Sequence, residues 1–218
     1  MEKQFVLTGF ADEISADTTA QLEGLKKLGV THIEPRNIDG KNIIKLTDEE
    51  VAAFKAKLEK YGISVSSIGS PLGKIKITDD FDAHFEEFKR TVEIAKMLDT
   101  KYIRMFSFFV DEKEADQKTD EVIEKLSKMV AYAEKHDVIL LHENEKAFTA
   151  TSQDAVRCFL TVLFRRTSRQ CSIFPTLSSA PRIRSKPTIC LKSISYTSTS
   201  RIAKTAVESF RPATATVT

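Results

Sequence analysis

The chain has 218 residues, of which 41% are hydrophobic and 29% charged, so it is long enough to bury one good-sized core. No run approaches the roughly 18 apolar residues of a membrane span, and the first residues lack the basic-then-apolar order of a signal peptide, so we expect a cytoplasmic protein without a membrane partner. The three cysteines are an odd number without CxxC spacing, which argues against a disulfide framework and against a zinc knuckle.

The net charge of +2 is an average over two regions of unlike composition. Residues 1–146 carry 29 acidic and 22 basic side chains, whereas residues 147–218 carry 2 acidic and 11 basic ones. The second region also holds 23 Ser or Thr residues and none of the seven glycines. The composition therefore divides the chain at Lys146 into a mixed first region, 1–146, and a basic Ser/Thr-rich tail, 147–218.

The first region alternates short apolar runs, typical of buried strands, with segments whose apolar residues recur at helical spacing. Thr47 followed by Glu50 forms a capping box, which predicts that a helix begins there, and Gly62 is its stop signal. In chain order we expect strands at residues 4–10, 32–36, 63–69, 101–106 and 138–141, and helices at 17–28, 47–62, 81–95 and 120–135.

Five strands that alternate with four helices predict an α/β protein with a parallel sheet and right-handed crossovers. Two architectures fit this pattern, a doubly wound sheet and part of a (β/α)8 barrel. The dinucleotide-binding form of the first needs a glycine fingerprint after strand one, and the segment GFADEIS holds Gly9 alone. We therefore expect a (β/α)8 TIM-barrel type, of which only the first five strands are recognisable.

In a (β/α)8 barrel the catalytic groups project from the C-terminal ends of the strands. Polar side chains recur at those ends here, although a solvated loop would explain any one of them equally well. Glu34 and Glu143 stand out because each follows an apolar strand residue and precedes a turn, where a carboxylate faces the barrel mouth. The polar residues at the predicted strand ends are Asp12, Glu13, Glu34, Arg36, Ser67, Ser70, Arg104 and Glu143.

The segments GFADEIS, HIEPR, YIRMFSFF and LLHENEK, in this order, resemble the sugar phosphate isomerases and epimerases of the xylose isomerase-like TIM-barrel superfamily, over residues 1–146. The resemblance implies that Glu143 is a catalytic residue and binds a divalent metal ion (Mn, Co, Mg or Zn). It also implies that Glu34 and Arg104 bind the substrate, a small-molecule sugar or sugar phosphate. The other ligands of the superfamily, an Asp, a His and a Glu after strands six, seven and eight, would lie downstream.

The implied reaction moves a proton on a carbon next to a carbonyl. It needs a base near the substrate and a cation that stabilises the developing enediolate charge. An epimerase trades the proton between two carboxylates on opposite sides of the sugar, and this chain offers only one of that pair. We therefore expect a member of an isomerase family that is inactive as written.

The tail has no matching motif in its own frame. If each codon from residue 147 onward is read one base earlier, AFTA at 147–150 can read GIYG. Segments 171–179, 196–202 and 209–217 can then spell sequences close to the strand-six, strand-seven and strand-eight signatures of the superfamily. This predicts that residues 147–218 are a frameshift product and poorly ordered.

Two other interpretations stay open at this point. The basic tail would attract phosphate, so the alternative to an enzyme is a nucleic-acid-binding or other non-catalytic binding protein, although nucleic acid is not the partner that we expect. The endonuclease branch of the same superfamily is another possible enzyme class. It needs several His ligands at strand ends, and in the first region only His142 stands near one.

Overall fold

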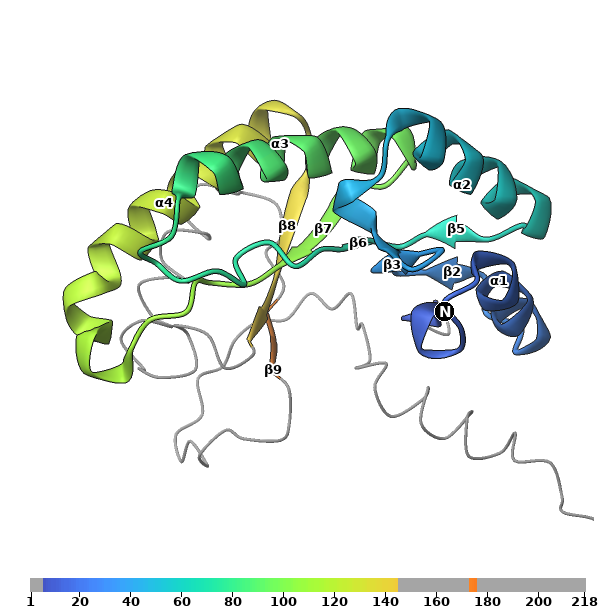
Figure 1. Cartoon of the computed structure of the whole chain (residues 1–218), viewed down its shortest axis with the longest axis horizontal. Helices are drawn as coiled ribbons and strands as arrows, with labels where there is room; N and C mark the ends of the chain where they lie inside the picture. Colours follow the sequence, from blue (N-terminus) through green and yellow to red (C-terminus); the bar gives the residue numbers. More distant parts are fainter. Residues whose placement is uncertain (1–5, 145–172, 176–218) are drawn as a thin grey trace, which may run out of the picture.

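The computed structural model of the chain describes residues 6–144 and 173–175, and every structural statement below concerns these residues. Short parallel strands form a curved inner layer, and α2, α3 and α4 lie along one side of it (Figure 1). The helices thus cover the outer face of the strands, as they do in a (β/α)8 barrel.

The strands follow one another across the sheets in their chain order. One sheet has the order β1-β2-β5 and a second has the order β6-β7-β8-β9, and all of these pairs are parallel. A doubly wound sheet would reverse its strand order at a switch point, whereas a barrel does not. This confirms the expected TIM-barrel type, and the described residues form no closed barrel. The parallel strands are β1 (Thr8–Gly9), β2 (His32–Ile33), β5 (Ser64–Val65), β6 (Ile68–Gly69), β7 (Tyr102–Met105), β8 (Ile139–Asn144) and β9 (Ile173–Pro175).

The single strand expected at 63–69 is divided into β5 and β6, which join the two sheets. Ser64 of β5 pairs with His32, whereas Ile68 of β6 pairs with Ile103 on the other side. The backbone between them turns back to β2, where the Ser66 N–H donates to the Ile33 carbonyl at 2.9 Å. The third strand of the barrel is therefore one run of chain that changes partner at its middle.

The four expected helices are all present, and local signals set their ends. Asp17 caps the first helix, and both reciprocal bonds of the Thr47 and Glu50 capping box form at the second. Gly62 directly follows the second helix and Gly29 lies two residues past the first, and both adopt positive φ, a conformation that glycine tolerates best. The helices are α1 (Thr18–Lys27), α2 (Asp48–Tyr61), α3 (Phe81–Met97) and α4 (Ala115–Lys135), and the 3-10 turns are η1 (Ala11–Glu13), η2 (Ile43–Lys45) and η3 (Glu112–Glu114).

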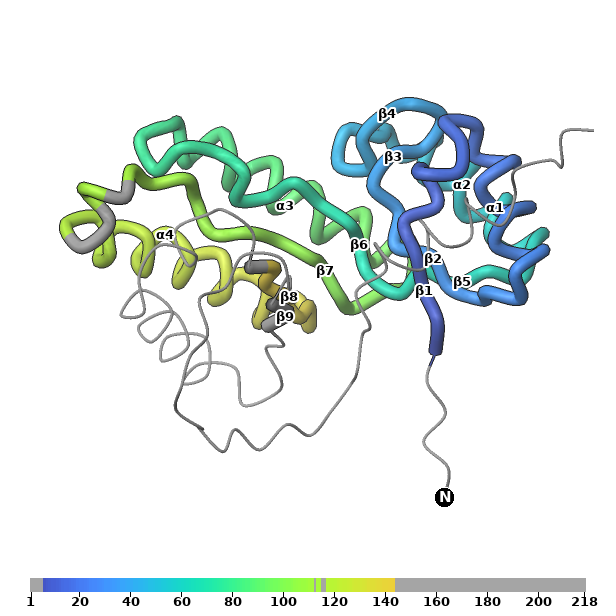
Figure 2. Tube along the Cα trace, turned by 90° about the horizontal axis from the view of Figure 1, so that it is seen from below, coloured from blue at the N-terminus to red at the C-terminus, as the bar shows by residue number. Residues whose placement is uncertain are grey.

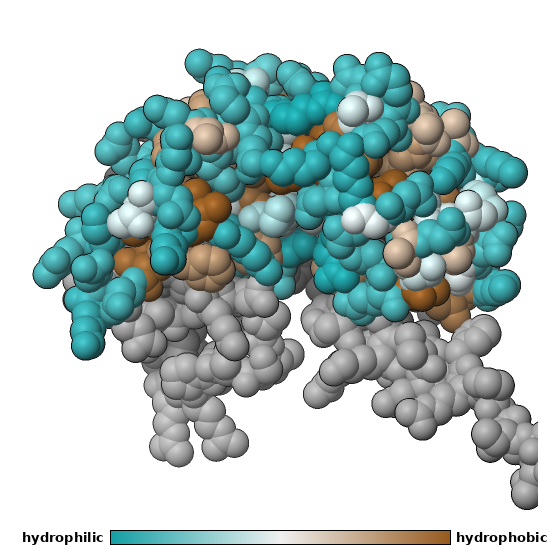
Figure 3. All heavy atoms as spheres, viewed as in Figure 1, coloured by the Kyte–Doolittle hydropathy of each residue, from teal (hydrophilic) through white to brown (hydrophobic). Residues whose placement is uncertain are grey.

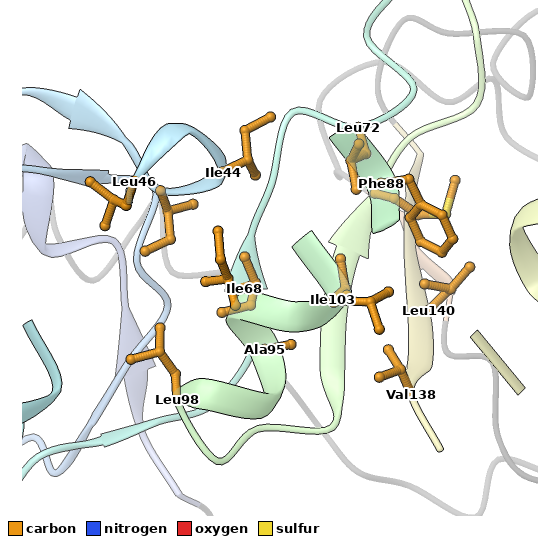
Figure 4. Packing of buried hydrophobic residues seen from close by; sticks show 14 of the residues in the cluster. Ile44, Leu46, Ile68, Leu72, Phe88, Ala95, Leu98, Ile103, Val138 and Leu140 are labelled. Atoms are coloured by element: carbon orange, nitrogen blue, oxygen red, sulfur yellow. The ribbon is translucent and has the colours of Figure 1, made fainter. Parts of the chain in front are cut away.

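The core lies between the helices and the strands. On α3, Phe88 and Ala95 are fully buried, and Figure 4 shows Ala95 between Ile68 and Ile103 and Phe88 beside Leu140. Burial of each large side chain contributes about 1.5 to 3 kcal/mol, which is why the apolar face of this helix predicts its orientation. Figure 2 shows α3 and α4 side by side over β7 and β8, so these four elements pack as one block.

Three features differ from the sequence-based expectations. An antiparallel hairpin of β3 (Asn37–Ile38) and β4 (Lys41–Asn42) follows β2, and its turn places Asp39 and Gly40 at positive φ. The Asp-Gly pair is a known signal for such a turn and could have been read from the sequence. The last long helix begins at Ala115 rather than 120. The strand expected at 138–141 extends to Asn144, so that Glu143 lies on a strand and not after it.

The tail lies outside the described residues except for β9 (Ile173–Pro175), which pairs with β8. Its expected poor order, its nucleic-acid alternative and its cysteines therefore stay predictions. Among the described helices none is long and apolar enough to cross a membrane. The face of the molecule in Figure 3 is largely hydrophilic over these helices.

Candidate active site

Arg104 joins the two carboxylates that the sequence singles out. Its Nε donates to Glu34 Oε1 at 2.6 Å, and its Nη1 donates to Glu143 Oε2 at 2.5 Å. Glu34 follows β2 directly, Arg104 lies on β7 and Glu143 lies on β8. Parallel strands end at the same edge, so three side chains distant in sequence meet at one rim. The structure thus brings together all three predicted site residues.

The three side chains are withdrawn from solvent. Their exposed fractions are 10% for Glu34, 14% for Arg104 and 21% for Glu143. Burial raises the pKa of Glu34, and the Arg104 charge beside it offsets only part of this effect. Two carboxylates share one guanidinium, so the rim carries an excess of negative charge. Such a carboxyl is suited to hold a proton closer to neutral pH than a solvated one.

Aromatic rings hold Arg104 in place. The centre of its guanidinium lies 5.1 Å from the centroid of Phe10 and 5.0 Å from that of Phe106. The Lys74 ammonium lies 4.1 Å from the same Phe106 ring. Cation–π contacts of this kind are worth about 0.5 to 2 kcal/mol each. Phe10 and Phe106 each follow a strand directly. The sequence analysis did not single out Phe10 and Phe106, and the signal that marks them is an aromatic residue directly after a predicted strand.

Gly69 leaves the space that Glu34 occupies. A Cβ at this position would lie 2.8 Å from Arg36 Cγ, 3.0 Å from the Pro35 carbonyl oxygen and 3.3 Å from Glu34 Cγ. Gly69 also stands opposite Arg104 in the register of β6 and β7. The absent side chain therefore lets the segment after β2 lie across the next strand. Nothing in the sequence pattern marks this requirement.

A second charge cluster connects the loop after β1 with β3. Arg36 binds Asp12 through Nε at 3.0 Å and Glu13 through Nη2 at 3.2 Å, and Asn37 Nδ2 donates to Asp12 at 2.8 Å. The Arg36 guanidinium also lies 4.3 Å from the Phe10 centroid. Arg36 therefore offsets one of these two negative charges, and the cluster joins two loops.

The remaining polar groups of the predicted rim are buried, and the two serines lie against the Glu34 and Arg104 pair. Ser70 Oγ donates to the Arg104 carbonyl, and Ser67 is fully buried. His142 is 2% exposed and lies 3.2 Å through Nε2 from Ser107 Oγ. Burial lowers the pKa of His142 to about 3, so the ring is neutral at physiological pH. Successive strand residues point to opposite faces, and His142 does not share a face with Glu143.

The described residues do not fit a divalent metal ion by themselves. Within 6–144 and 173–175, no three His, Cys, Asp or Glu side chains converge as a ligand set would. The Glu143 carboxylate is held by the Arg104 cation, and Glu34 binds the same guanidinium. Hard divalent ions need several oxygen ligands together. This part of the chain therefore supplies at most one arm of a metal site.

The fold is of the (β/α)8 barrel type without closure in the described residues, and its polar rim lies at the strand ends. The family model for the xylose isomerase-like TIM barrel matches residues 22–162, and the chain belongs to this family. The match continues past Lys146 into the tail. No curated protein shows significant sequence similarity to the chain.

Several solved structures share the fold. A xylose isomerase-like TIM barrel protein from Mycobacterium smegmatis, in complex with magnesium, has 19% identity and a TM-score of 0.55, with 72% of this chain and 55% of that one covered. The probable 3-DHS dehydratase AsbF of Bacillus anthracis, involved in petrobactin synthesis, has 16% identity and a TM-score of 0.61, with 78% and 62% covered. A D-allulose 3-epimerase from Methylomonas sp., in complex with D-allulose, has 14% identity and a TM-score of 0.58, with 78% and 62% covered. The chain thus spans less than two thirds of each of these proteins.

Proposed function

We propose that this chain is the N-terminal part of a sugar or sugar phosphate isomerase or epimerase that moves a proton on a carbon next to a carbonyl. The observation that carries this proposal is the chain of ion pairs from Glu34 through Arg104 to Glu143 at three strand ends. It sets acid, base and hydrogen-bond donor side by side at the rim where such barrels perform catalysis. We also propose that this protein acts in the cytoplasm.

Each of the three residues has a role that its surroundings support. Glu143 is the base at the reacting carbon. Together with ligands that the described residues do not supply, it would hold a divalent ion, which would supply positive charge next to the carbonyl. Glu34 accepts from the hydroxyl groups of the sugar, and burial raises the pKa of its carboxyl group, so its carboxylate is a stronger base than a solvated one. Arg104 holds both carboxylates apart by its two donors and offers its remaining N–H groups to substrate oxygens.

The described residues, 6–144 and 173–175, supply only part of this site. A single carboxylate competes poorly with water for a hydrated divalent ion, and no three His, Cys, Asp or Glu side chains converge on one site within the described residues. We attribute the missing part to a frameshift after Lys146. The place of β9 supports the idea because Ile173 stands opposite His142 on β8, in the position of a sixth barrel strand. In the shifted frame codon 173 can read Asp, the ligand type implied at that strand.

The test compares the chain as written with a frame-restored version. Both are assayed for interconversion of neutral and phosphorylated ketoses with manganese, cobalt, magnesium or zinc. We expect turnover from the restored version alone, and Glu143→Gln in that version should abolish it, while Glu124→Gln on the outer face of α4 should not. Metal-stimulated turnover by the unrepaired chain that persists in Glu143→Gln would refute two claims: that Glu143 belongs to the active site, and that the unrepaired chain is inactive.

The alternative class predicts a different result. A nucleic-acid-binding protein that uses the basic tail would bind DNA with strong salt dependence, and deletion of 147–218 would remove that binding. Gel shifts with DNA, measured at several salt concentrations for the full chain and for the chain without 147–218, separate the two classes. For an isomerase fragment we expect only the weak attraction of a basic tail to phosphate.

A further inference from the structure

The loop between β6 and α3 is attached to the helix by a histidine ring. The Gly73 N–H donates to His84 Nε2 at 3.0 Å, and His84 is 5% exposed. A ring nitrogen that accepts a hydrogen bond carries no proton, so this bond needs a neutral imidazole with its proton on Nδ1. His84 Nδ1 lies 3.7 Å from Glu87 Oε2, where a proton on that nitrogen is favourable.

The same loop forms a wall of the candidate active site. The Phe106 N–H donates to the Leu72 carbonyl at 2.8 Å, and Lys74 places its ammonium 4.1 Å from the Phe106 ring. Arg104 lies 5.0 Å from that ring. The loop therefore fixes Phe106 from one side while Phe106 contacts Arg104. A displacement of the loop would change the surroundings of the guanidinium that holds Glu34 and Glu143.

Gly73 allows little adjustment at this contact. Its φ is +84°, and a Cβ built on it would lie 2.1 Å from the Phe106 carbonyl oxygen. The loop and β7 are thus in direct backbone contact at this residue. If His84 gained a second ring proton, two donors would face each other across 3.0 Å, and the loop would have to move away as a unit.

The charges around His84 come from three elements. Glu87 on the same helix faces Nδ1, and Lys45 of η2 is paired with Glu87. Lys125 of α4 lies 5.9 Å from the Phe108 ring, which His84 contacts edge to face at 6.2 Å. Burial lowers the pKa of His84, Glu87 opposes this shift and Lys45 reinforces it. The neutral ring is therefore favoured, and it gains its proton only at a pH below the ordinary range of histidine.

We propose that His84 is the positioning residue of the loop 70–76: as a neutral acceptor it holds the loop against Phe106, and on protonation it releases the loop and opens the wall beside Arg104. This device depends on the observed contacts and not on the proposed activity. It would make the geometry of the rim respond to acid whatever substrate the site takes.

Amide exchange of the full chain, followed by NMR between pH 7.5 and pH 4, tests the proposal. We expect the protection factor of the Gly73 amide to fall at least tenfold as the pH is lowered across this range, while the Ile103 amide on β7 keeps its protection. In the same samples the imidazole nitrogen spectrum should show His84 Nε2 unprotonated at pH 7 and protonated where the protection is lost.

Two substitutions separate positioning from general packing. His84→Gln places an amide oxygen near the site of Nε2, so Gly73 should stay protected across the whole range. His84→Phe fills the space without an acceptor, and Gly73 should exchange rapidly at every pH. His136→Gln, on the far end of α4, is the matched control and should keep the wild-type response. Unchanged protection in His84→Phe, or a wild-type pH response in His84→Gln, would overturn the proposal.

Discussion

Arg104 Nε donates to Glu34 Oε1 at 2.6 Å, although 70 residues separate the two in the chain. Both side chains are largely buried, and burial already raises the pKa of Glu34. We expect Arg104→Met to lower the free energy of unfolding by about 3 kcal/mol at pH 7, because it leaves a buried carboxylate without its cation. Urea denaturation followed by circular dichroism measures this loss.

The same substitution should give a pH-dependent penalty. Without Arg104 the folded pKa of Glu34 rises further above its unfolded value, so the penalty is full above that folded pKa and shrinks as the pH falls through it. The double variant Arg104→Met, Glu34→Gln removes the charge and should recover part of the stability at pH 7. An equal loss at pH 7 and pH 4.5 would show that the cost is packing alone.

Gly73 and Gly62 both adopt positive φ but differ in their surroundings. At Gly62 nothing lies within 4 Å of a built Cβ, so Gly62→Ala should cost only the conformational strain of about 1 kcal/mol. At Gly73 the built Cβ lies 2.1 Å from a backbone oxygen, so Gly73→Ala should cost more than about 3 kcal/mol or prevent folding. Thermal melts of the two variants should differ accordingly, and equal losses would contradict the close approach of the loop to Phe106.

Gly69 and Gly24 form a second matched pair. Gly69→Ala would press on the Pro35 carbonyl oxygen and on Glu34, and we expect it to cost about 1 to 3 kcal/mol and to weaken the coupling between Glu34 and Arg104. Gly24→Ala lies inside α1, where the built Cβ lies 2.9 Å from Cδ1 and 3.3 Å from Cγ2 of Ile14. Ile14 is 44% exposed and has room to move, so helix propensity should raise stability by up to about 1 kcal/mol. A double-mutant cycle of Gly69→Ala with Arg104→Met measures the coupling, and strict additivity would argue against this role of Gly69.

The nucleotide sequence tests the origin of the tail. Read one base earlier from codon 147, it should encode segments close to the strand-six, strand-seven and strand-eight signatures, with no stop codon before the strand-eight glutamate. Sequencing of the gene across this codon is the measurement. Stop codons in the shifted frame would contradict the frameshift and show that residues 147–218 are encoded in the correct reading frame.

Some expected elements follow from short-range patterns in the sequence. The capping box at Thr47 and Glu50 and the stop at Gly62 concern neighbours within one helical turn, and the structure reproduces them. The apolar face of α3 is equally local in origin. The placement of Glu34, Arg104 and Glu143 at one rim also followed from the sequence, because strands that alternate with helices are parallel and end at the same edge.

The tertiary structure alone decided which charges pair at that rim. Arg36 and Arg104 both follow or lie on strands beside acidic residues, yet Arg36 binds Asp12 while Arg104 takes both Glu34 and Glu143. These pairings depend on the register between strands, on the space that Gly69 leaves and on the rings that hold each guanidinium. The sequence determined the barrel type and the edge at which the polar groups meet, since these depend on local periodicity and connection order. The partner of each charge depended on side chains brought together from distant parts of the chain, and such contacts exist only once the strands are packed.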